Sequence, residues 1–155
     1  MMKKGLLILL CLPLMTLAQK TYVPDDNFEV FLEANGMGDG IYPNDSVFTG
    51  NINNITFLDV SWMNIADLTG IEDFIALTNL NFEGNQLTTL DVSNNTALIY
   101  FDCRINQLTS LDVSNNTALN QLTCFNNLLT TLDVNGATAL TYLGCQNNQL
   151  TTLDV

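Results

Sequence analysis

Apolar and polar residues alternate along the chain in a pattern that recurs every 21 residues from Leu77 onwards. In each copy, apolar residues occupy the first, fourth, sixth, eleventh, fourteenth and sixteenth positions. An alternation of period two, as in the pairs Leu80/Phe82 and Leu90/Val92, predicts short β-strands rather than helices. The copies start at residues 77, 98, 119 and 140 and read LTNLNFEGNQLTTLDVSNNTA, LIYFDCRINQLTSLDVSNNTA, LNQLTCFNNLLTTLDVNGATA and LTYLGCQNNQLTTLDV, the last being incomplete.

One 21-residue turn cannot bury its own apolar side, so the copies are expected to stack with parallel strands about 4.8 Å apart. Burying a Leu or Val contributes roughly 1.5 to 3 kcal/mol, which offsets the backbone entropy only where both flanks of a turn are covered. The pattern therefore predicts a curved solenoid made mainly of short strands and coil.

An asparagine recurs at the ninth position of every copy, where the strand must end and the chain must turn. A buried Asn side chain can hydrogen-bond the backbone groups that a turn leaves unpaired. An irregular first copy, residues 55–76, carries its asparagine one residue late as Asn64, so it is not expected to join this row unbroken. The predicted structural ladder consists of Asn85, Asn106, Asn127 and Asn148.

The pattern L-x-x-L-x-L-x-x-N-x-L in each copy resembles that of leucine-rich repeats, with Phe101 and Cys103 at two leucine positions of the second copy. The phrase LDVSNNTAL, with Cys at the sixth position, is similar to secreted leucine-rich-repeat proteins of flavobacteria, which are in turn similar to bacterial internalins. The resemblance covers residues 55–155 and implies a leucine-rich-repeat solenoid. The chain stops at Val155 in mid-copy, which would leave the edge of the core exposed, so it is expected to be a fragment of a longer protein. The resemblance also implies further repeats and often a sorting domain.

The first residues, 1–18, are predicted to be a secretory signal peptide. Lys3 and Lys4 precede an apolar run over residues 6–17, and small residues before Ala18 favour cleavage there. The run is too short for a transmembrane helix, which needs about 20 apolar residues. We therefore expect a secreted or cell-surface protein without membrane insertion.

Residues 19–54 are predicted to form an N-terminal cap with one helix. The helix is expected to begin at Asp26, with Glu29 placed for a capping box, and to end at Gly36. Its apolar stripe is expected to cover the open core of the first turn. Residues 36–54 are predicted to be a loop with one edge strand.

The composition restricts the function. The chain has 16 acidic residues, 4 basic residues and no histidine, so its field repels phosphate backbones, and no nucleic-acid partner is expected. Without histidine there is no ready general base near neutral pH, and no glycine-rich phosphate loop or nucleophile triad is found. The sequence therefore predicts neither an enzyme nor a cofactor.

Three cysteines, Cys103, Cys124 and Cys145, lie 21 residues apart at the inward sixth position. Three thiolates in a line without histidine suit a tetrahedral metal site poorly, and three cysteines cannot all pair as disulfides. The favoured interpretation is a column of small buried apolar residues.

A second row of repeated residues consists of the aspartates Asp91, Asp112, Asp133 and Asp154, which are expected to face solvent. Like charges about 5 Å apart cost roughly 0.8 kcal/mol per pair in water, so something should offset the repulsion. Bridging calcium is one interpretation. The favoured one is that each carboxylate accepts hydrogen bonds from the Ser-Asn-Asn turn that follows it.

The exposed positions of the first strand in each copy are expected to line the concave face, the usual binding surface of such solenoids. Aromatic rings among amides suit recognition of a protein, or of a glycan, because flat rings supply contact area at low entropy cost. One alternative is that the rings occur there only because aromatic residues favour strands. Another is that the domain is a spacer within a longer surface protein. The concave-face candidates are Phe57, Trp62, Tyr100, Arg104, Phe125 and Tyr142.

Overall fold

The computed structural model describes residues 18–153. The signal peptide predicted up to Ala18 and the calcium candidate Asp154 therefore lie outside the described part, Ala18 itself excepted. The elements in chain order are β1 (Lys20–Tyr22), α1 (Asp26–Ala34), β2 (Ser46–Phe48), α2 (Thr49–Ile52), β3 (Phe57–Asp59), the 3-10 helix η1 (Ile71–Asp73), β4 (Asn79–Asn81), β5 (Tyr100–Asp102), β6 (Ser110–Asp112), β7 (Gln121–Thr123), β8 (Thr131–Asp133) and β9 (Tyr142–Gly144).

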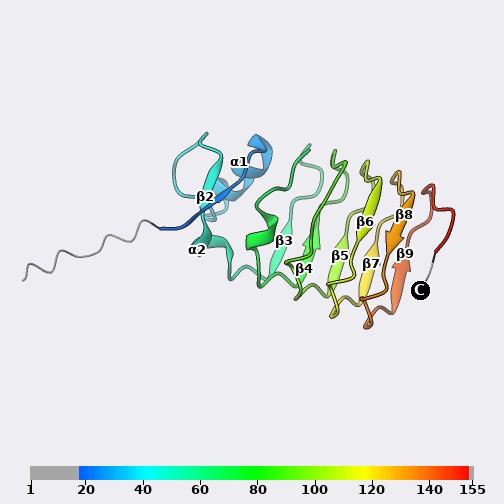
Figure 1. Cartoon of the computed structure of the whole chain (residues 1–155). Coiled ribbons are helices and arrows are strands. Elements are labelled where there is room, and N and C mark those ends of the chain that lie inside the picture. The colour runs from blue at the N-terminus through cyan, green and yellow to red at the C-terminus, as the bar shows by residue number, and fades with distance from the viewer. Residues whose placement is uncertain (1–17, 154–155) are drawn as a thin grey trace, which may run out of the picture.

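The chain folds as a leucine-rich-repeat solenoid, as the 21-residue pattern predicts (Figure 1). Its first strands form a parallel five-stranded sheet in the order β3-β4-β5-β7-β9. The register advances by one copy per strand: Asn79 pairs with Tyr100, Tyr100 with Gln121, and Gln121 with Tyr142. Residues at the same position of successive copies therefore lie side by side on one face of this sheet.

The inward leucine positions stack into a continuous core along the solenoid. The first-position residues Leu77, Leu98 and Leu119 are fully buried, and so are the eleventh-position leucines Leu87, Leu108 and Leu129. In the last copy, Leu140 and Leu143 are only partly buried, because no later copy packs on them among the described residues. Phe82 and Phe101 fill the middle of the core, with ring centroids 5.4 Å apart.

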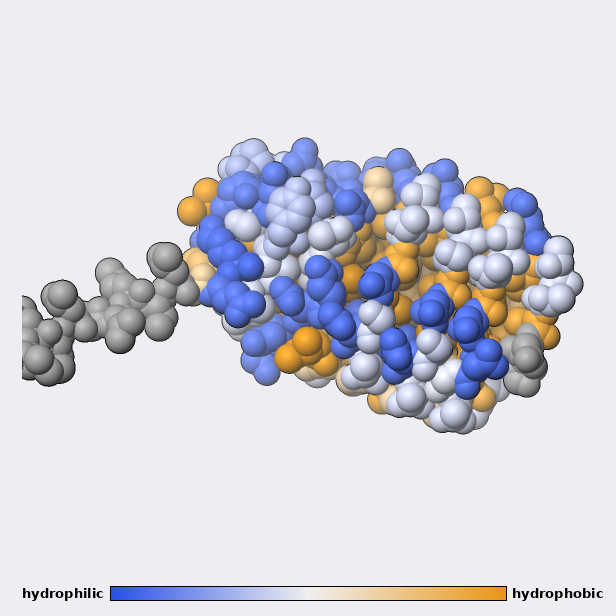
Figure 2. Space-filling view, viewed as in Figure 1, coloured by the Kyte–Doolittle hydropathy of each residue, from blue (hydrophilic) through white to orange (hydrophobic). Residues whose placement is uncertain are grey.

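A second, two-stranded parallel sheet pairs β6 with β8, so that Asp112 lies beside Asp133. In this pair Leu111 and Leu132 point inward and the flanking residues point to solvent. The copies that start at residues 98 and 119 thus contribute two short strands each, which matches the two alternations of the hydrophobic pattern in those copies. In Figure 2, apolar residues show between rows of hydrophilic ones along this part of the molecule.

The N-terminal cap contains α1, as predicted, and more regular structure than the sequence pattern indicates. β1 pairs antiparallel with β2, and α2 adds one short helical turn after β2. The prediction of a single helix was therefore incomplete, and β1 was missed. Its pairing joins Thr21 to Val47, residues that are far apart in sequence.

The predicted capping box of α1 is wrong. The N-cap residue is Asp25, whose carboxylate accepts hydrogen bonds from the backbone N–H groups of Asn27 and Phe28. Glu29 is buried, and it accepts a hydrogen bond from the N–H of Asn44 at 3.0 Å instead of reaching back to the helix start. A tertiary contact has replaced the local one because the loop before β2 folds over this side of the helix.

The end of α1 is as predicted and positions the helix on the solenoid. Gly36 has a φ of 73°, and the N–H of Met37 donates to the carbonyl of Leu32 at 2.9 Å, a pairing that closes helices at a left-handed glycine. Phe28 stacks on Phe74 with 6.2 Å between ring centroids. The apolar side of α1 therefore covers the first turn.

Among residues 18–153, no helix is long and apolar enough to cross a bilayer.

Candidate functional site

The most structured part of the five-stranded face lies at the second and third copies. Arg104 and Phe125 follow β5 and β7 by two residues, at equivalent positions of adjacent copies, and Glu83 occupies the same position after β4. Since adjacent parallel strands lie about 4.8 Å apart, these three side chains are neighbours in space. Together with Tyr100 and Asp102 of β5 they form what we call the Arg104 cluster.

Arg104 is held from three sides. Its Nη2 lies 2.6 Å from Oε2 of Glu83, and its Nε lies 3.4 Å from Oδ2 of Asp102. The guanidinium also lies over the ring of Phe125, 5.5 Å from the centroid. A cation over an aromatic face is attracted by the quadrupole of the ring. The arginine is thus fixed in place before any ligand arrives.

Asp102 connects the aromatic and charged members of the cluster. It is buried, its Oδ2 accepts a hydrogen bond from the hydroxyl of Tyr100 at 3.2 Å, and its Oδ1 accepts one from the backbone N–H of Arg104. Burial raises the pKa of Asp102 against the lowering effect of these hydrogen bonds and of the Arg104 charge. The side chain therefore acts as an anchor beneath the cluster rather than as a surface charge.

The protonation states of the other members follow from the same contacts. Hydrogen bonding to Glu83 raises the pKa of Arg104, which keeps the guanidinium charged. Burial, and secondarily the charge of Asp102, raises the pKa of Tyr100, which keeps the phenol neutral. Nε of Arg104 has no hydrogen-bond partner among the described residues. The cluster therefore presents a fixed cation, two rings and a hydroxyl, a set suited to binding.

The other predicted concave-face residues are not brought into this cluster. Phe57 on β3 and Tyr142 on β9 lie on the same row as Tyr100, but each is two strands away from it. Both are well exposed, at 65% and 53%. They extend the aromatic row toward the two ends of the sheet.

Trp62 is well exposed, at 63%, but it does not lie on a strand. β3 ends at Asp59, and Trp62 lies in the following turn with a φ of 60°. Its ring packs against Gly84, because a Cβ atom on that glycine would come within 2.4 Å of the indole. A side chain at residue 84 would collide with the indole, so the glycine in the copy that starts at residue 77 makes room for Trp62.

The ninth-position asparagines each join two turns of the solenoid. Oδ1 of Asn127 accepts a hydrogen bond from the N–H of Leu108, and its Nδ2 donates to the carbonyls of Cys103 and Cys124. Asn85, Asn106 and Asn148 make the equivalent hydrogen bonds to the copy that precedes each of them. In the irregular copy, Asn64 stands outside this row with a φ of 57°, and its carbonyl accepts a bond from Asn27.

A second buried row of asparagines was missed by the sequence analysis. Nδ2 of Asn95 donates to the carbonyls of Ile71 and Phe74, and Nδ2 of Asn116 donates to those of Val92 and Asn95. Both side chains are fully buried. The repeated phrase SNNTA carried the signal, since its second Asn recurs after 21 residues.

The described aspartates of the second row accept hydrogen bonds from the turns that follow them. Oδ1 of Asp91 and of Asp112 accepts the N–H of Ser93 and Ser114 at 2.9 and 2.8 Å, and Asp133 accepts the N–H of Asn135 at 3.0 Å. These contacts lower the pKa of Asp91, mainly through the backbone N–H of Ser93, and that of Asp112, mainly through the Ser114 side chain. Each described carboxylate in the row thus has a local donor.

The cysteine column lies inside the solenoid. Cys103 and Cys124 are buried, Cys145 is half-buried, and all three thiols are free. Burial raises the pKa of Cys103 well above its usual range and also raises that of Cys145. The environment therefore disfavours the thiolate that nucleophilic or metal chemistry requires.

No family model matches the chain, but comparison with known proteins finds similar internalins. Internalin J of Listeria monocytogenes serotype 4b is 42% identical over 75 residues, which are 48% of this chain and 8% of internalin J. The structure of the functional domain of InlJ from Listeria monocytogenes, which includes a cysteine ladder, matches with a TM-score of 0.79 at 40% identity over 89% of this chain and 31% of that one.

The internalin InlF from the same species matches with a TM-score of 0.64 at 22% identity, covering 85% of this chain and 46% of that one, and so supports the fold alone. The chain spans less than a tenth of the curated relative and about a third of the InlJ structure. In its leucine-rich repeats the chain is internalin-like.

Proposed function

We propose that this chain is an extracellular, non-catalytic module for protein interaction or adhesion, and that it binds its partner with the five-stranded face. The Arg104 cluster is the observation that supports this proposal most strongly. A spacer needs only the inward residues of each copy, whereas here an arginine, two carboxylates and two rings from adjacent copies are organised on one outward face.

The composition of the cluster is that of a binding hot spot. Tyr and Arg are enriched among the residues that dominate interface energetics, and side chains fixed before binding lose less entropy on association. Arg104 is already held by Glu83, Asp102 and Phe125. The half-buried ring of Phe125, over which the guanidinium lies, is the part of the cluster against which a partner packs.

The chemistry of the face favours a protein over a glycan. The chain carries a formal charge of −12, so a neutral or basic partner surface meets least repulsion. The exposed rings of Phe57 and Tyr142 extend the aromatic row on both sides of the cluster, which suits a long, flat contact. The similarity to internalin J supports a role at the bacterial surface, and the predicted signal peptide supports export.

The test is a screen followed by affinity measurements on variants. The biotinylated chain is used as a probe against an array of purified extracellular protein domains and an array of glycans. Binders are then titrated by surface plasmon resonance against wild type, Tyr100→Ala and Phe125→Ala. Tyr22→Ala serves as the matched control, because Tyr22 is an exposed ring on β1 in the cap.

We expect at least one protein binder whose affinity falls about tenfold or more in Tyr100→Ala and Phe125→Ala, since hot-spot truncations cost roughly 2 kcal/mol or more. Circular dichroism confirms that each variant is folded. Tyr22→Ala should bind as wild type does. Equal affinity in all four proteins would rule out the face as the binding site, and a chain with no binder on either array would favour the spacer.

A further inference from the structure

The cap holds a group of carboxylates that the interaction face does not use. Asp26 and Glu29 lie three residues apart at the start of α1, and Asp45 directly precedes β2. One carboxylate oxygen from each of the three lies within 4.8 Å of the other two. Asp45 is held in place by its backbone, because its carbonyl accepts the N–H of Val23 at 2.9 Å.

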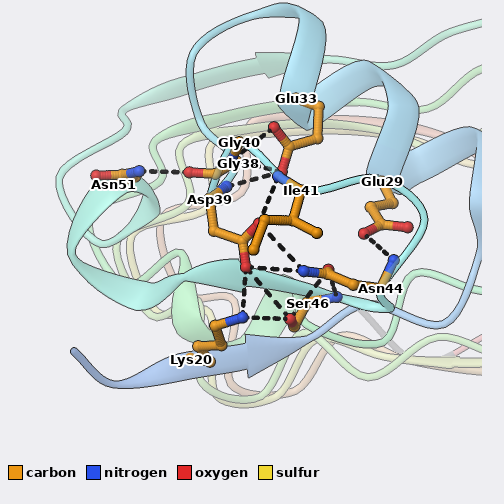
Figure 3. Close-up of polar contacts among 10 residues, drawn as sticks. All are labelled: Lys20, Glu29, Glu33, Gly38, Asp39, Gly40, Ile41, Asn44, Ser46 and Asn51. Carbon is orange, nitrogen blue, oxygen red and sulfur yellow. Dashed lines mark hydrogen bonds and ion pairs between the residues drawn. The ribbon is translucent and has the colours of Figure 1, made fainter. Parts of the chain in front are cut away.

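Glu29 is the unusual member of this group. It is fully buried, and its Oε1 accepts the N–H of Asn44, as Figure 3 shows. Its Oε2 accepts no hydrogen bond from any residue that the structure describes. A buried carboxylate oxygen without a partner is costly, so Oε2 calls for a partner that the described residues do not supply, such as a water molecule or a cation.

No basic side chain of the described residues is free to supply that charge. Lys20 and Arg104 are the two basic residues in residues 18–153. Lys20 pairs with Asp39 at 2.5 Å on the other side of the cap loop (Figure 3), and Arg104 pairs with Glu83 in the repeats. Neither of these two basic side chains therefore pairs with Asp26, Glu29 or Asp45.

We propose that Asp26, Glu29 and Asp45 bind one calcium ion. The donors are all carboxylate oxygens, which hard divalent cations prefer, and no histidine or thiolate is present to favour zinc. Oxygens around calcium lie about 2.3 to 2.6 Å from the ion, so two ligands of one ion lie up to about 5 Å apart, which accommodates the observed spacing. Magnesium requires shorter distances and stricter geometry.

The ion joins two parts of the cap that are separate in sequence. It connects the first turns of α1 to Asp45, the residue that precedes β2, on the side where Glu29 already accepts a hydrogen bond from the N–H of Asn44. Because α1 covers the first turn of the core through Phe28 and Phe74, an ion bound here stabilises the end of the solenoid. This site is separate from the Asp91, Asp112 and Asp133 row on the repeats.

The experiment is isothermal titration of the full chain with calcium chloride at fixed ionic strength, with magnesium chloride as the comparison. Variants are Glu29→Gln, Asp26→Asn and Asp45→Asn, and Asp112→Asn is the matched control on the repeats. Asp26 and Asp45 are exposed, and asparagine tolerates the φ of 54° at position 45, so these two variants keep the fold even if Glu29→Gln does not.

We expect one saturable calcium site per chain, weaker magnesium binding, and a melting temperature that calcium raises more than matched sodium chloride does. Asp26→Asn and Asp45→Asn should each weaken calcium binding about tenfold or more, because affinity follows the number of charged ligands. Asp112→Asn should bind as wild type does. Absence of saturable calcium binding to wild type, or loss of binding in Asp112→Asn with retention in Asp45→Asn, overturns the proposal.

Discussion

Two buried asparagines of the same chain should differ sharply in what they contribute to stability. Asn127 belongs to the ninth-position row and Asn116 to the row that the sequence analysis missed. Both make hydrogen bonds to backbone groups, so a count of lost bonds would treat Asn127→Ala and Asn116→Ala as similar. What matters is whether a backbone group is left without any partner.

Asn127→Ala leaves one such group. The N–H of Leu108 donates to Oδ1 of Asn127 at 3.0 Å and has no other acceptor among residues 18–153. A buried donor left unpaired costs about 1–3 kcal/mol, and the two lost donations to Cys103 and Cys124 add about 0.5–1.5 kcal/mol each. We expect the free energy of unfolding to fall by about 3–4 kcal/mol.

Asn116→Ala leaves no buried backbone group without a hydrogen-bond partner. The carbonyls of Val92 and Asn95 also accept backbone N–H groups, at 3.0 and 3.1 Å, and Oδ1 of Asn116 has no partner to lose. The next copy carries Ala137 at the same position, buried at 5% exposure, so alanine fits there. We expect a loss of about 1 kcal/mol, because two hydrogen bonds are removed while an unsatisfied oxygen is removed with them.

The assay is thermal and urea unfolding followed by circular dichroism, with Asn115→Ala, an exposed neighbour, as the control. For a chain of this size 1 kcal/mol corresponds to about 2–4 °C in the melting temperature. Asn127→Ala should therefore melt roughly 6–16 °C below wild type, and Asn116→Ala within about 4 °C of it. Equal losses in the two variants would refute the reasoning from unpaired groups.

Two further predictions concern acid stability and backbone strain. The ion pair with Lys20, followed by weaker hydrogen bonds, lowers the pKa of Asp39 from 3.8 to about 2, so the contribution of this carboxylate to stability is present above pH 4 and is lost as the pH falls toward 2. The urea midpoint, measured at pH 4.5, 3 and 2, should therefore fall less steeply in Asp39→Asn than in wild type. Parallel pH dependences of the midpoint in the two proteins would contradict this. Gly84→Ala should destabilise the chain more than Gly36→Ala, because both glycines have φ near 70° but only a side chain at residue 84 would collide with the indole of Trp62. Gly84→Ala should also shift the fluorescence emission of Trp62. Equal stability and unchanged emission in the two variants would show that the contact is unimportant.

The repeat region could be predicted from the sequence because its interactions are between equivalent positions. Once the 21-residue spacing places Leu77 beside Leu98, the register of the sheet and the burial of the cysteine column follow from stacking alone. The second asparagine row obeys the same rule, but it occurs in only two copies and its residues also suit an exposed turn. Composition at a turn does not tell whether an amide points inward.

The cap was harder to predict because its contacts join residues that no repeat relates. The pairing of β1 with β2 and the contact from Asn44 to Glu29 depend on how the loop folds over α1. Asp25 and Asp26 are equally suited to cap a helix by local rules, so the sequence could not choose between them. Likewise, the place of Trp62 depends on Gly84 in the next copy, a contact between two irregular positions.

The candidate site was predicted in its members but not in its organisation. Tyr100, Arg104 and Phe125 stood out as exposed residues that vary among otherwise constant copies. The parts played by Asp102 and Glu83 depend on side-chain contacts across strands, which periodicity alone does not specify.

The most direct test of the central claim is hydrogen–deuterium exchange of the chain with and without the protein binder from the array. If the five-stranded face is the binding surface, peptides covering 100–104 and 121–125 should become protected in the complex, and those covering 110–112 and 131–133 on the second sheet should exchange as in the free chain. Protection of the second sheet, with the Arg104 cluster unchanged, would contradict the account.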